Sequence, residues 1–266
     1  MIKTLVSIEV DLASSLAIRL ACQLGAQMNM EIQPVYIKES PSHESVWGAG
    51  WASRTWEKEM VEQGRAEISD LLTPEQDYCT VLEQPRVIYG DKEGELLKLV
   101  LAEHFDIFIE GASFAWTLNE LYKRLHSRLY QKIPSPVILV RAFRKVNRVQ
   151  LLCFDAQGVE TLTNVVQSIW EGCPVPLVLN YPAEDTDKTG AHELREAVDR
   201  ARGLLEEASC TVTVQDNLSR NPDVQAAEIL KDCGLVGIAM ERSPKKDCLE
   251  LQWLSEVKTS SLLAFR

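Results

Sequence analysis

The sequence predicts an α/β protein built from two tandem, doubly wound domains, each with a mostly parallel five-stranded sheet. Three observations support this fold class. Short apolar segments alternate with longer segments whose apolar residues recur at helical spacing. The same order of segments occurs twice along the chain, and 266 residues suit two modest domains. Strands that are separated by helices of this length require right-handed crossovers, which make neighbouring strands parallel.

The first half contains five expected strands and four expected helices. Leu16, Leu20 and Leu24 follow a helical period, whereas the run Ile107-Phe108-Ile109 is typical of a strand covered on both faces. We expect Pro74 to end the second helix, after an insertion over residues 39–53. The predicted strands are 3–10, 31–37, 78–83, 106–110 and 136–141, and the predicted helices are 12–28, 55–72, 92–104 and 118–132.

The second half repeats this order in a shorter form, which favours an internal duplication. We place the boundary near residue 145, which gives domains 1–145 and 146–266. The last strand of each half should lie at a sheet edge, and we expect the two to meet antiparallel because exposed apolar edges must be paired or covered. The predicted strands are 149–155, 176–181, 210–215, 235–240 and 261–265, and the predicted helices are 159–171, 192–209, 222–233 and 249–257.

Charge and hydropathy limit the classes of partner. The net charge is −11, and neither half is basic, so a broad surface for nucleic acid is disfavoured. The longest apolar runs, such as 133–140, fall well short of the roughly 20 residues that a membrane span needs. The N-terminus alternates and carries an early acidic residue, which indicates a first strand and not a signal peptide. We therefore expect a cytoplasmic protein with no membrane partner.

The seven cysteines are scattered, odd in number and without C-x-x-C spacing. The four histidines are also far apart, so no zinc site is expected. We interpret the cysteines as reduced and mostly buried thiols.

No motif for catalysis is found. The chain lacks G-x-S-x-G, H-E-x-x-H, G-x-x-x-x-G-K-[ST] and a G-x-G-x-x-G that follows a strand. We therefore expect no enzyme. Trp47, Trp51 and Trp56 are close in sequence and either cover a ligand or partner site or, as we favour, pack the insertion onto the domain.

Several segments carry a resemblance to a known family. Four segments carry it: the opening strand 4–9, Tyr89-Gly90-Asp91 before a helix, the stretch 105–113, and the stretch 127–140. The last of these enters a strand through Pro134-Ser135-Pro136-Val137. In these features the chain resembles the universal stress protein family in its tandem two-domain form. The resemblance covers nearly all of residues 1–142 and is weaker in 146–266, where 151–155 matches the opening strand. It implies that the two domains form a pseudo-dimer within one chain, and it leaves a homodimer open.

The family's ATP site uses a loop of the form G-x2-G-x9-G-(S/T), in which glycines let the backbone approach phosphate. Here Gly111 stands at the first position, Phe114 at the second, and Lys123-Arg124 or Arg124-Leu125 at the third. Ordinary ATP binding is therefore expected to be lost, although Lys123 and Arg124 could supply charge in place of the missing donors. The candidate pocket that the resemblance implies consists of Glu9, Val35, Gly90, Gly111, Lys123, Arg124 and Asp155. No glycine follows the corresponding strand 235–240, so we expect Asp155 to be a structural residue at the end of a strand.

The sequence thus predicts a cytoplasmic stress-response or regulatory protein that acts by binding a protein partner or a small ligand, without a cofactor. One alternative is an adenine-nucleotide-binding stress protein whose altered phosphate site uses Gly111, Lys123 and Arg124. A second alternative is an enzyme of the wider adenine-nucleotide α/β superfamily.

Overall fold

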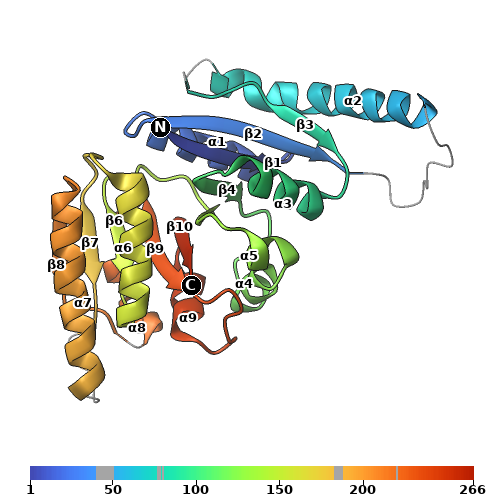
Figure 1. The fold of residues 1–266 in the computed structure, drawn as a ribbon. Coiled ribbons are helices and arrows are strands. Elements are labelled where there is room, and N and C mark those ends of the chain that lie inside the picture. The colour runs from blue at the N-terminus through green and yellow to red at the C-terminus, as the bar shows by residue number, and fades with distance from the viewer. Residues whose placement is uncertain (40–50, 77–78, 80, 183–187, 220) are drawn as a thin grey trace.

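The fold is built on one sheet of ten strands in a computed structural model of the chain. The structure describes residues 1–39, 51–76, 79, 81–182, 188–219 and 221–266. The strand order is β3-β2-β1-β4-β5-β10-β9-β6-β7-β8, so strands β1 to β5 of the first half stand beside strands β6 to β10 of the second (Figure 1). Every pairing within a half is parallel, which confirms the predicted fold class.

The elements alternate along the chain as the sequence predicts. In the first half they are β1 (Ile2–Ile8), α1 (Leu12–Gly25), β2 (Met30–Lys38), α2 (Trp51–Gln76), β3 (Arg86–Tyr89), α3 (Lys92–Glu103), β4 (Ile107–Gly111), α4 (Leu118–Leu125), α5 (Arg128–Lys132) and β5 (Val137–Val140). In the second half they are β6 (Val149–Leu152), α6 (Ala156–Trp170), β7 (Leu177–Asn180), α7 (Lys188–Glu207), β8 (Val212–Gln215), α8 (Pro222–Ile229), β9 (Leu235–Met240), α9 (Leu249–Glu256) and β10 (Ser260–Phe265). The predicted domain boundary near residue 145 falls between β5 and β6.

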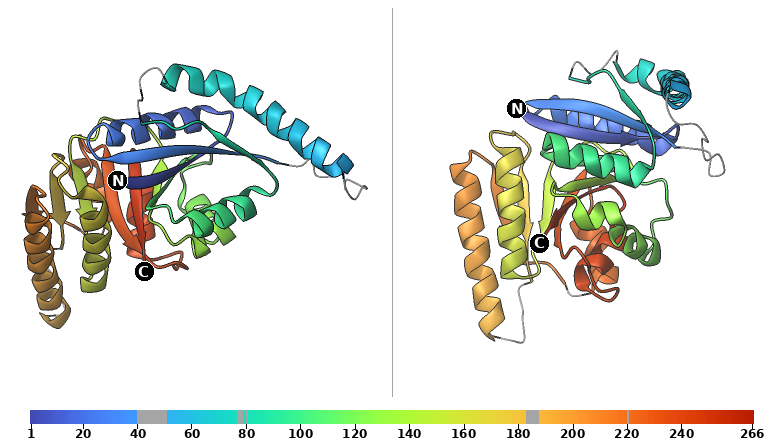
Figure 2. Two further views of the ribbon diagram at one scale, coloured as in Figure 1. Left: turned by 45° about the horizontal axis from the view of Figure 1, so that its top comes forward. Right: turned by 45° about the vertical axis from the view of Figure 1, so that its right-hand side comes forward.

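The core lies in two layers, one on each face of the sheet. Side chains of α1, α2, α6 and α7 pack on one face, and those of α3, α4, α5, α8 and α9 pack on the other. Successive residues of a strand point to opposite faces, so Leu5 belongs to one layer and Val6 to the other. The two views in Figure 2 show helices on both faces of the strands. This three-layer arrangement explains why the strands are apolar at consecutive positions.

The two halves are joined by their last strands. β5 and β10 pair antiparallel, with Val140 opposite Ser260 and Val137 opposite Leu263. This confirms the predicted antiparallel meeting of the two strands and the pseudo-dimer within one chain. The apolar edge of each five-stranded half is thereby covered by the other half.

The third strand lies later than the sequence predicts. We expected residues 78–83, of which 78 and 80 lie outside the described residues, whereas β3 is Arg86–Tyr89 and pairs with Val35–Lys38 of β2. The expected segment meets β2 only at an isolated bridge between Ile32 and Leu82. The prediction was wrong because Cys79 is bonded to α1, which holds the start of this segment away from a regular ladder.

Two helix predictions also need correction. Helix α2 does not stop at Pro74 but continues to Gln76, where the buried Glu75 accepts a hydrogen bond from Arg19 of α1 at 2.8 Å. The expected helix 118–132 is two helices, because Ser127 is extended and begins α5 as a new helix. The break lets α4 and α5 approach the same buried carboxylate, as described below.

Cys22 of α1 and Cys79 form a disulfide bond, with 5.5 Å between their Cα atoms. This contradicts the expectation that all seven cysteines are thiols. Sequence spacing cannot reveal the bond, because 57 residues separate the two cysteines and the fold alone brings them together. The other five are free, and four of these are buried, namely Cys153, Cys173, Cys210 and Cys233.

None of the helices that the structure describes is long and apolar enough to cross a membrane. The Trp47 and Trp51 side chains lie outside the described residues, so the role of the insertion remains a prediction.

Candidate functional site

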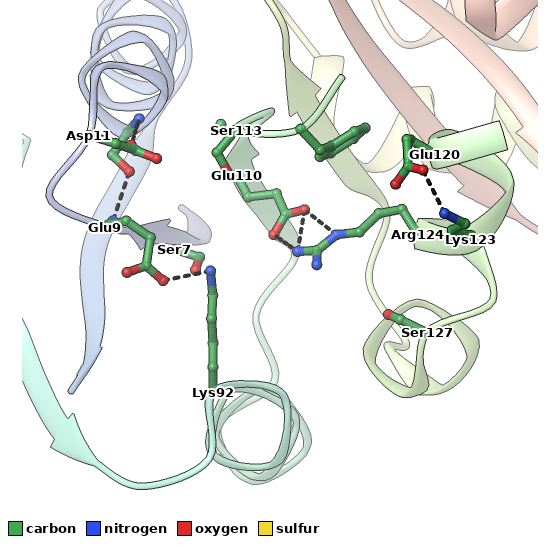
Figure 3. A pocket seen from close by; sticks show the side chains of 13 residues that line it. Ser7, Glu9, Asp11, Lys92, Glu110, Ser113, Glu120, Lys123, Arg124 and Ser127 are labelled. Atoms are coloured by element: carbon green, nitrogen blue, oxygen red, sulfur yellow. Dashed lines mark hydrogen bonds and ion pairs between the residues drawn. The ribbon is translucent and has the colours of Figure 1, made fainter. Parts of the chain in front are cut away.

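A cavity of about 320 Å³ lies in the first half at the carboxyl ends of β1 and β4 (Figure 3). β1 is flanked by β2 and β4, and the chain leaves β1 and β4 toward opposite faces of the sheet. Such a switch point is where ligands bind in open α/β sheets. The cavity is lined by Ser7, Glu9, Asp11, Ser14, Lys92, Glu110, Gly111, Ser113, Phe114, Glu120, Lys123, Arg124 and Ser127.

The turn from β1 to α1 forms one wall of the cavity and is held by two hydrogen bonds of Ser14. The Ser14 amide donates to Asp11 Oδ1 at 2.8 Å, so Asp11 caps α1, and the Glu9 amide donates to Ser14 Oγ at 2.7 Å. The Glu9 carboxylate then pairs with Lys92 Nζ of α3 at 2.6 Å. The first cation of the cavity is therefore already bound to a carboxylate.

Glu110 and Arg124 form the floor of the cavity. Arg124 donates to both carboxylate oxygens of Glu110, with Nη2 to Oε2 at 2.6 Å and Nε to Oε1 at 3.0 Å. The Glu110 side chain is only 4 % exposed. The fully buried Tyr130 of α5 also donates its hydroxyl to Glu110. One carboxylate thus receives donors from both α4 and α5, which accounts for the break between these helices.

The protonation states of this cluster follow from burial and charge. Burial and the Glu110 carboxylate raise the pKa of Tyr130 well above its usual value, so its hydroxyl stays a donor. Burial alone would lower the pKa of Arg124, but Glu110 raises it, so the guanidinium stays charged. Tyr130 and Arg124 therefore both remain hydrogen-bond donors at neutral pH.

The third cation, Lys123, lies at the rim. Its Nζ pairs with Glu120 Oε1 at 2.6 Å across one turn of α4, and its side chain is 70 % exposed. Among the described residues, the cations that line this cavity are Lys92, Lys123 and Arg124, and each has a carboxylate partner (Figure 3). The cavity is therefore close to electrostatic balance and does not concentrate positive charge.

Gly111 is a glycine because helix α1 approaches it. A Cβ atom on Gly111 would lie 2.1 Å from the carbonyl oxygen of Ala13, a separation that no side chain tolerates. The resemblance to the family implies that the backbone of this glycine lies close to a phosphate group. Here the close approach is to the protein's own backbone at the start of α1.

The loop after β4 contacts the second half of the chain. Phe114 lines the cavity and stacks on Trp116, whose indole Nε1 donates to the Leu254 carbonyl at 3.0 Å. Arg141 lies over the Trp116 ring and donates to the Val257 carbonyl at 2.7 Å. The segment in which the family has its second phosphate-loop glycine therefore holds α9 of the other domain.

The cavity gathers four of the seven predicted site residues, namely Glu9, Gly111, Lys123 and Arg124. Val35 and Gly90 do not line it: Val35 is fully buried in β2, and the Gly90 amide donates to the Lys38 carbonyl. Four charged residues of the cavity were not predicted as site residues, namely Asp11, Lys92, Glu110 and Glu120. The only sequence signal for Glu110 is a charge that ends an apolar strand, and its partner is not visible in the sequence.

Asp155 lies in the second half and caps α6, since its carboxylate accepts from the Gly158 amide at 2.7 Å. Its counterpart in the first half is therefore Asp11, the cap of α1, and not Glu9, which stands two residues earlier. Arg266 also pairs with Asp155 at 2.8 Å and with Glu250 at 2.9 Å. These contacts hold the carboxyl end of the second half's sheet together.

No group of three or more His, Cys, Asp or Glu side chains suited to a metal ion occurs within the part of the chain that the structure describes.

Comparisons with known proteins show which solved structures have a similar fold. No family model and no curated protein matches the sequence. Among solved structures, a universal stress protein from Archaeoglobus fulgidus DSM 4304 is similar over 99 % of this chain and 98 % of its own, with a TM-score of 0.62 and 13 % identity. A putative universal stress protein from Pseudomonas aeruginosa UCBPP-PA14 is similar over 99 % and 92 %, with a TM-score of 0.59 and 13 % identity. The cytoplasmic domain of a prokaryotic cation chloride cotransporter is similar over 98 % and 94 %, with a TM-score of 0.51 and 11 % identity.

Proposed function

We propose that this chain, which has the tandem fold of universal stress proteins, is a divergent member of that family. As such it is a cytoplasmic stress-response or regulatory protein that acts by binding a protein partner or a small ligand. In this proposal the protein is not an enzyme, and its first domain does not hold ATP in the family's phosphate pose.

The observation that carries the proposal is the pairing of the cavity's cations. Arg124 is engaged by Glu110 and Lys92 by Glu9, both at 2.6 Å. A phosphate chain would add negative charge beside these carboxylates and would compete with them for the same donors. Because the Glu110 side chain is buried, taking Arg124 from it would leave an unpaired buried charge, which is strongly unfavourable.

Two further features support the same conclusion. The Gly111 backbone faces Ala13 and not open space, and the Phe114 side chain occupies the cavity wall where the family has a glycine. Beside the cavity, Val10 and Leu12 flank the cap residue Asp11 and are 58 % and 75 % exposed. Exposed apolar side chains at the rim favour contact with a partner there.

The second candidate is a nucleotide site that uses Lys123. The pair of Lys123 with Glu120 is exposed, and exposed ion pairs of this kind are weak, typically below about 1 kcal/mol. Lys123 could therefore turn toward a ligand at small cost. The third candidate, an enzyme of the wider adenine-nucleotide superfamily, has no phosphate motif in its favour.

Calorimetric titration of the intact protein with Mg-ATP tests the proposal. Ser113 is exposed and lines the cavity, so Ser113→Trp fills the cavity from its rim without changing a buried group. We expect no micromolar binding that depends on Ser113. Micromolar binding in the wild type that is lost in Ser113→Trp would overturn the proposal and favour the second candidate, and steady consumption of ATP would favour the third.

The control for this titration is Ser168→Trp, an exposed serine of α6 in the other domain. It introduces the same bulk far from the cavity. Gly111→Trp is not a suitable probe, because any side chain at this position meets Ala13 and disturbs α1 whether or not a ligand binds.

A further inference from the structure

A second cavity, of about 330 Å³, lies where the two domains join. Its walls come from the linker after β5, the end of α8, and the turn between α9 and β10. It is lined by Arg144, Ala226, Ala227, Leu230, Lys231, Asp232, Glu256, Lys258 and Thr259. None of these residues belongs to the cavity of the first domain.

The cations of this junction cavity are available, unlike those of the first cavity. Arg144, Lys231 and Lys258 are all exposed, and within the described part of the chain none of them forms an ion pair with a carboxylate. They come from three separate segments and line the same space. In a protein with a net charge of −11, a cavity with three free cations is a local site for an anion.

Thr259 is a polar residue among those that line the cavity. The residue is 2 % exposed, and its Oγ1 has no hydrogen-bond partner among the described residues. Its backbone is fixed, because the Arg141 amide donates to the Thr259 carbonyl. A buried hydroxyl without a partner is unfavourable, so a ligand oxygen that accepts its hydrogen bond would stabilise this position.

Two carboxylates, Asp232 and Glu256, line the same cavity. The two carboxylates reduce the positive charge of the cavity but, within the described residues, do not form ion pairs with its cations. Three cations and two carboxylates line the cavity, so positive charge is in excess. An anion that binds there must carry enough charge to be attracted despite them. This favours a multiply charged ligand over a monovalent anion.

From these observations we propose that the junction cavity binds a phosphate-bearing small molecule through Arg144, Lys231, Lys258 and the Thr259 hydroxyl. Phosphoryl oxygens accept charge-assisted hydrogen bonds from lysine and arginine and a further bond from a hydroxyl. Free pyrophosphate and the phosphate chain of a nucleotide share this chemistry. The site does not depend on the function proposed above, because it shares no residue with the first cavity.

A structural explanation competes with this proposal. α8 and α9 both end at the cavity, and lysines near helix carboxyl ends stabilise helices through the macrodipole. In that case Lys231 and Lys258 would contribute to stability alone. Binding and stability must therefore be measured on the same variants.

The test is a calorimetric titration of the full chain with pyrophosphate at low and moderate salt. Binding to the wild type is expected to weaken with salt. Lys231→Ala with Lys258→Ala should weaken binding about tenfold or more, and Thr259→Val should weaken it several-fold. Glu256→Gln should strengthen binding, because it removes a repulsive charge. A titration with ATP then distinguishes a nucleotide from a free phosphate ligand by which of the two binds more tightly.

The matched control is Lys98→Ala, which removes an exposed lysine of the first domain that lines neither cavity and should leave pyrophosphate binding unchanged. Thermal unfolding of each variant completes the comparison. Absence of pyrophosphate binding in the wild type, or equal binding in the double lysine variant, would overturn the proposal. A drop in stability without a change in binding would assign the lysines to the helix ends.

Discussion

Arg124 donates hydrogen bonds to both carboxylate oxygens of Glu110, and the Glu110 side chain is almost completely buried. This contact lies between β4 and α4, at the floor of the cavity of the first domain. Arg124 was a candidate for binding phosphate, and it is instead paired with a buried carboxylate. The proposal that the first domain does not hold ATP in the family's phosphate pose depends on this ion pair.

Replacing Arg124 by methionine should destabilise the protein by about 3–5 kcal/mol, because it leaves the Glu110 carboxylate buried without its cation. Chemical unfolding measures this effect. Lys123→Met is the control on the same helix, since its ion pair is exposed and the change should stay within about 1 kcal/mol. The double variant Arg124→Met with Glu110→Gln should recover part of the loss. Equal stabilities of the two single variants would argue against the buried pair.

Gly111→Ala should be strongly destabilising, by about 1–3 kcal/mol or more, because the new Cβ would meet the Ala13 carbonyl at 2.1 Å and force α1 from β4. Gly203→Ala in α7 is a matched control. No atom of the described residues lies within 4 Å of a Cβ atom there, so the helix should gain roughly 0.5–1 kcal/mol. A Gly111→Ala variant as stable as the wild type would show that α1 does not constrain this position.

Reduction of the Cys22–Cys79 bridge should lower the free energy of unfolding by about 2–4 kcal/mol, because the bond closes a long loop. Unfolding with and without reductant measures the difference, and Cys22→Ser should match the reduced protein. Alkylation of the unreduced, denatured chain should modify five cysteines. Modification of all seven would contradict the bridge.

The same alkylation, applied to the folded protein, should be slow at Cys153. Burial raises the pKa of Cys153 to about 12, and only the thiolate reacts readily.

Alkylation of intact cells before lysis would report whether the Cys22–Cys79 bridge exists in the compartment where the protein works. A bridge seen only after lysis would support the proposed cytoplasmic location.

Acid should weaken the contact between α2 and β2. Hydrogen bonds from Lys38 and Tyr36 lower the pKa of Glu67 below its ordinary value of 4.5. A depressed carboxyl pKa contributes stability above pH 4.5, and this contribution is lost as the pH falls from there through the pKa of the folded state. Glu67→Gln should flatten the fall of the unfolding midpoint in this range. An unchanged pH profile in Glu67→Gln would exclude the contribution of this group.

Much of the fold could be predicted because its signals are local. The apolar run of β4 and the leucine spacing of α1 fix element type within a few residues, and the Pro-x-Pro-Val entry marks β5. Predictions failed where distant contacts decide the outcome. Cys79 is tied to α1 and displaces β3 along the chain, and Glu75 on Arg19 extends α2 past Pro74.

The same division holds for the site. Four of the residues that the resemblance implies, Glu9, Gly111, Lys123 and Arg124, lie at one cavity. Their partners could not be predicted, because Glu110 and Ala13 meet them only through the packing of β4 against α1 and α4. The role of each motif residue changes with its partner: Gly111 accommodates a helix, and Arg124 neutralises a buried acid.

Hydrogen exchange followed by mass spectrometry, with and without Mg-ATP, tests the central claim most directly because it locates any binding. The account predicts unchanged exchange in the β1–α1 turn and in residues 111–118. Any protection by ATP should be confined to the junction around Arg144 and Lys258. Protection of the β1–α1 turn together with residues 111–118 would contradict the claim that the first domain has lost the family's phosphate pose.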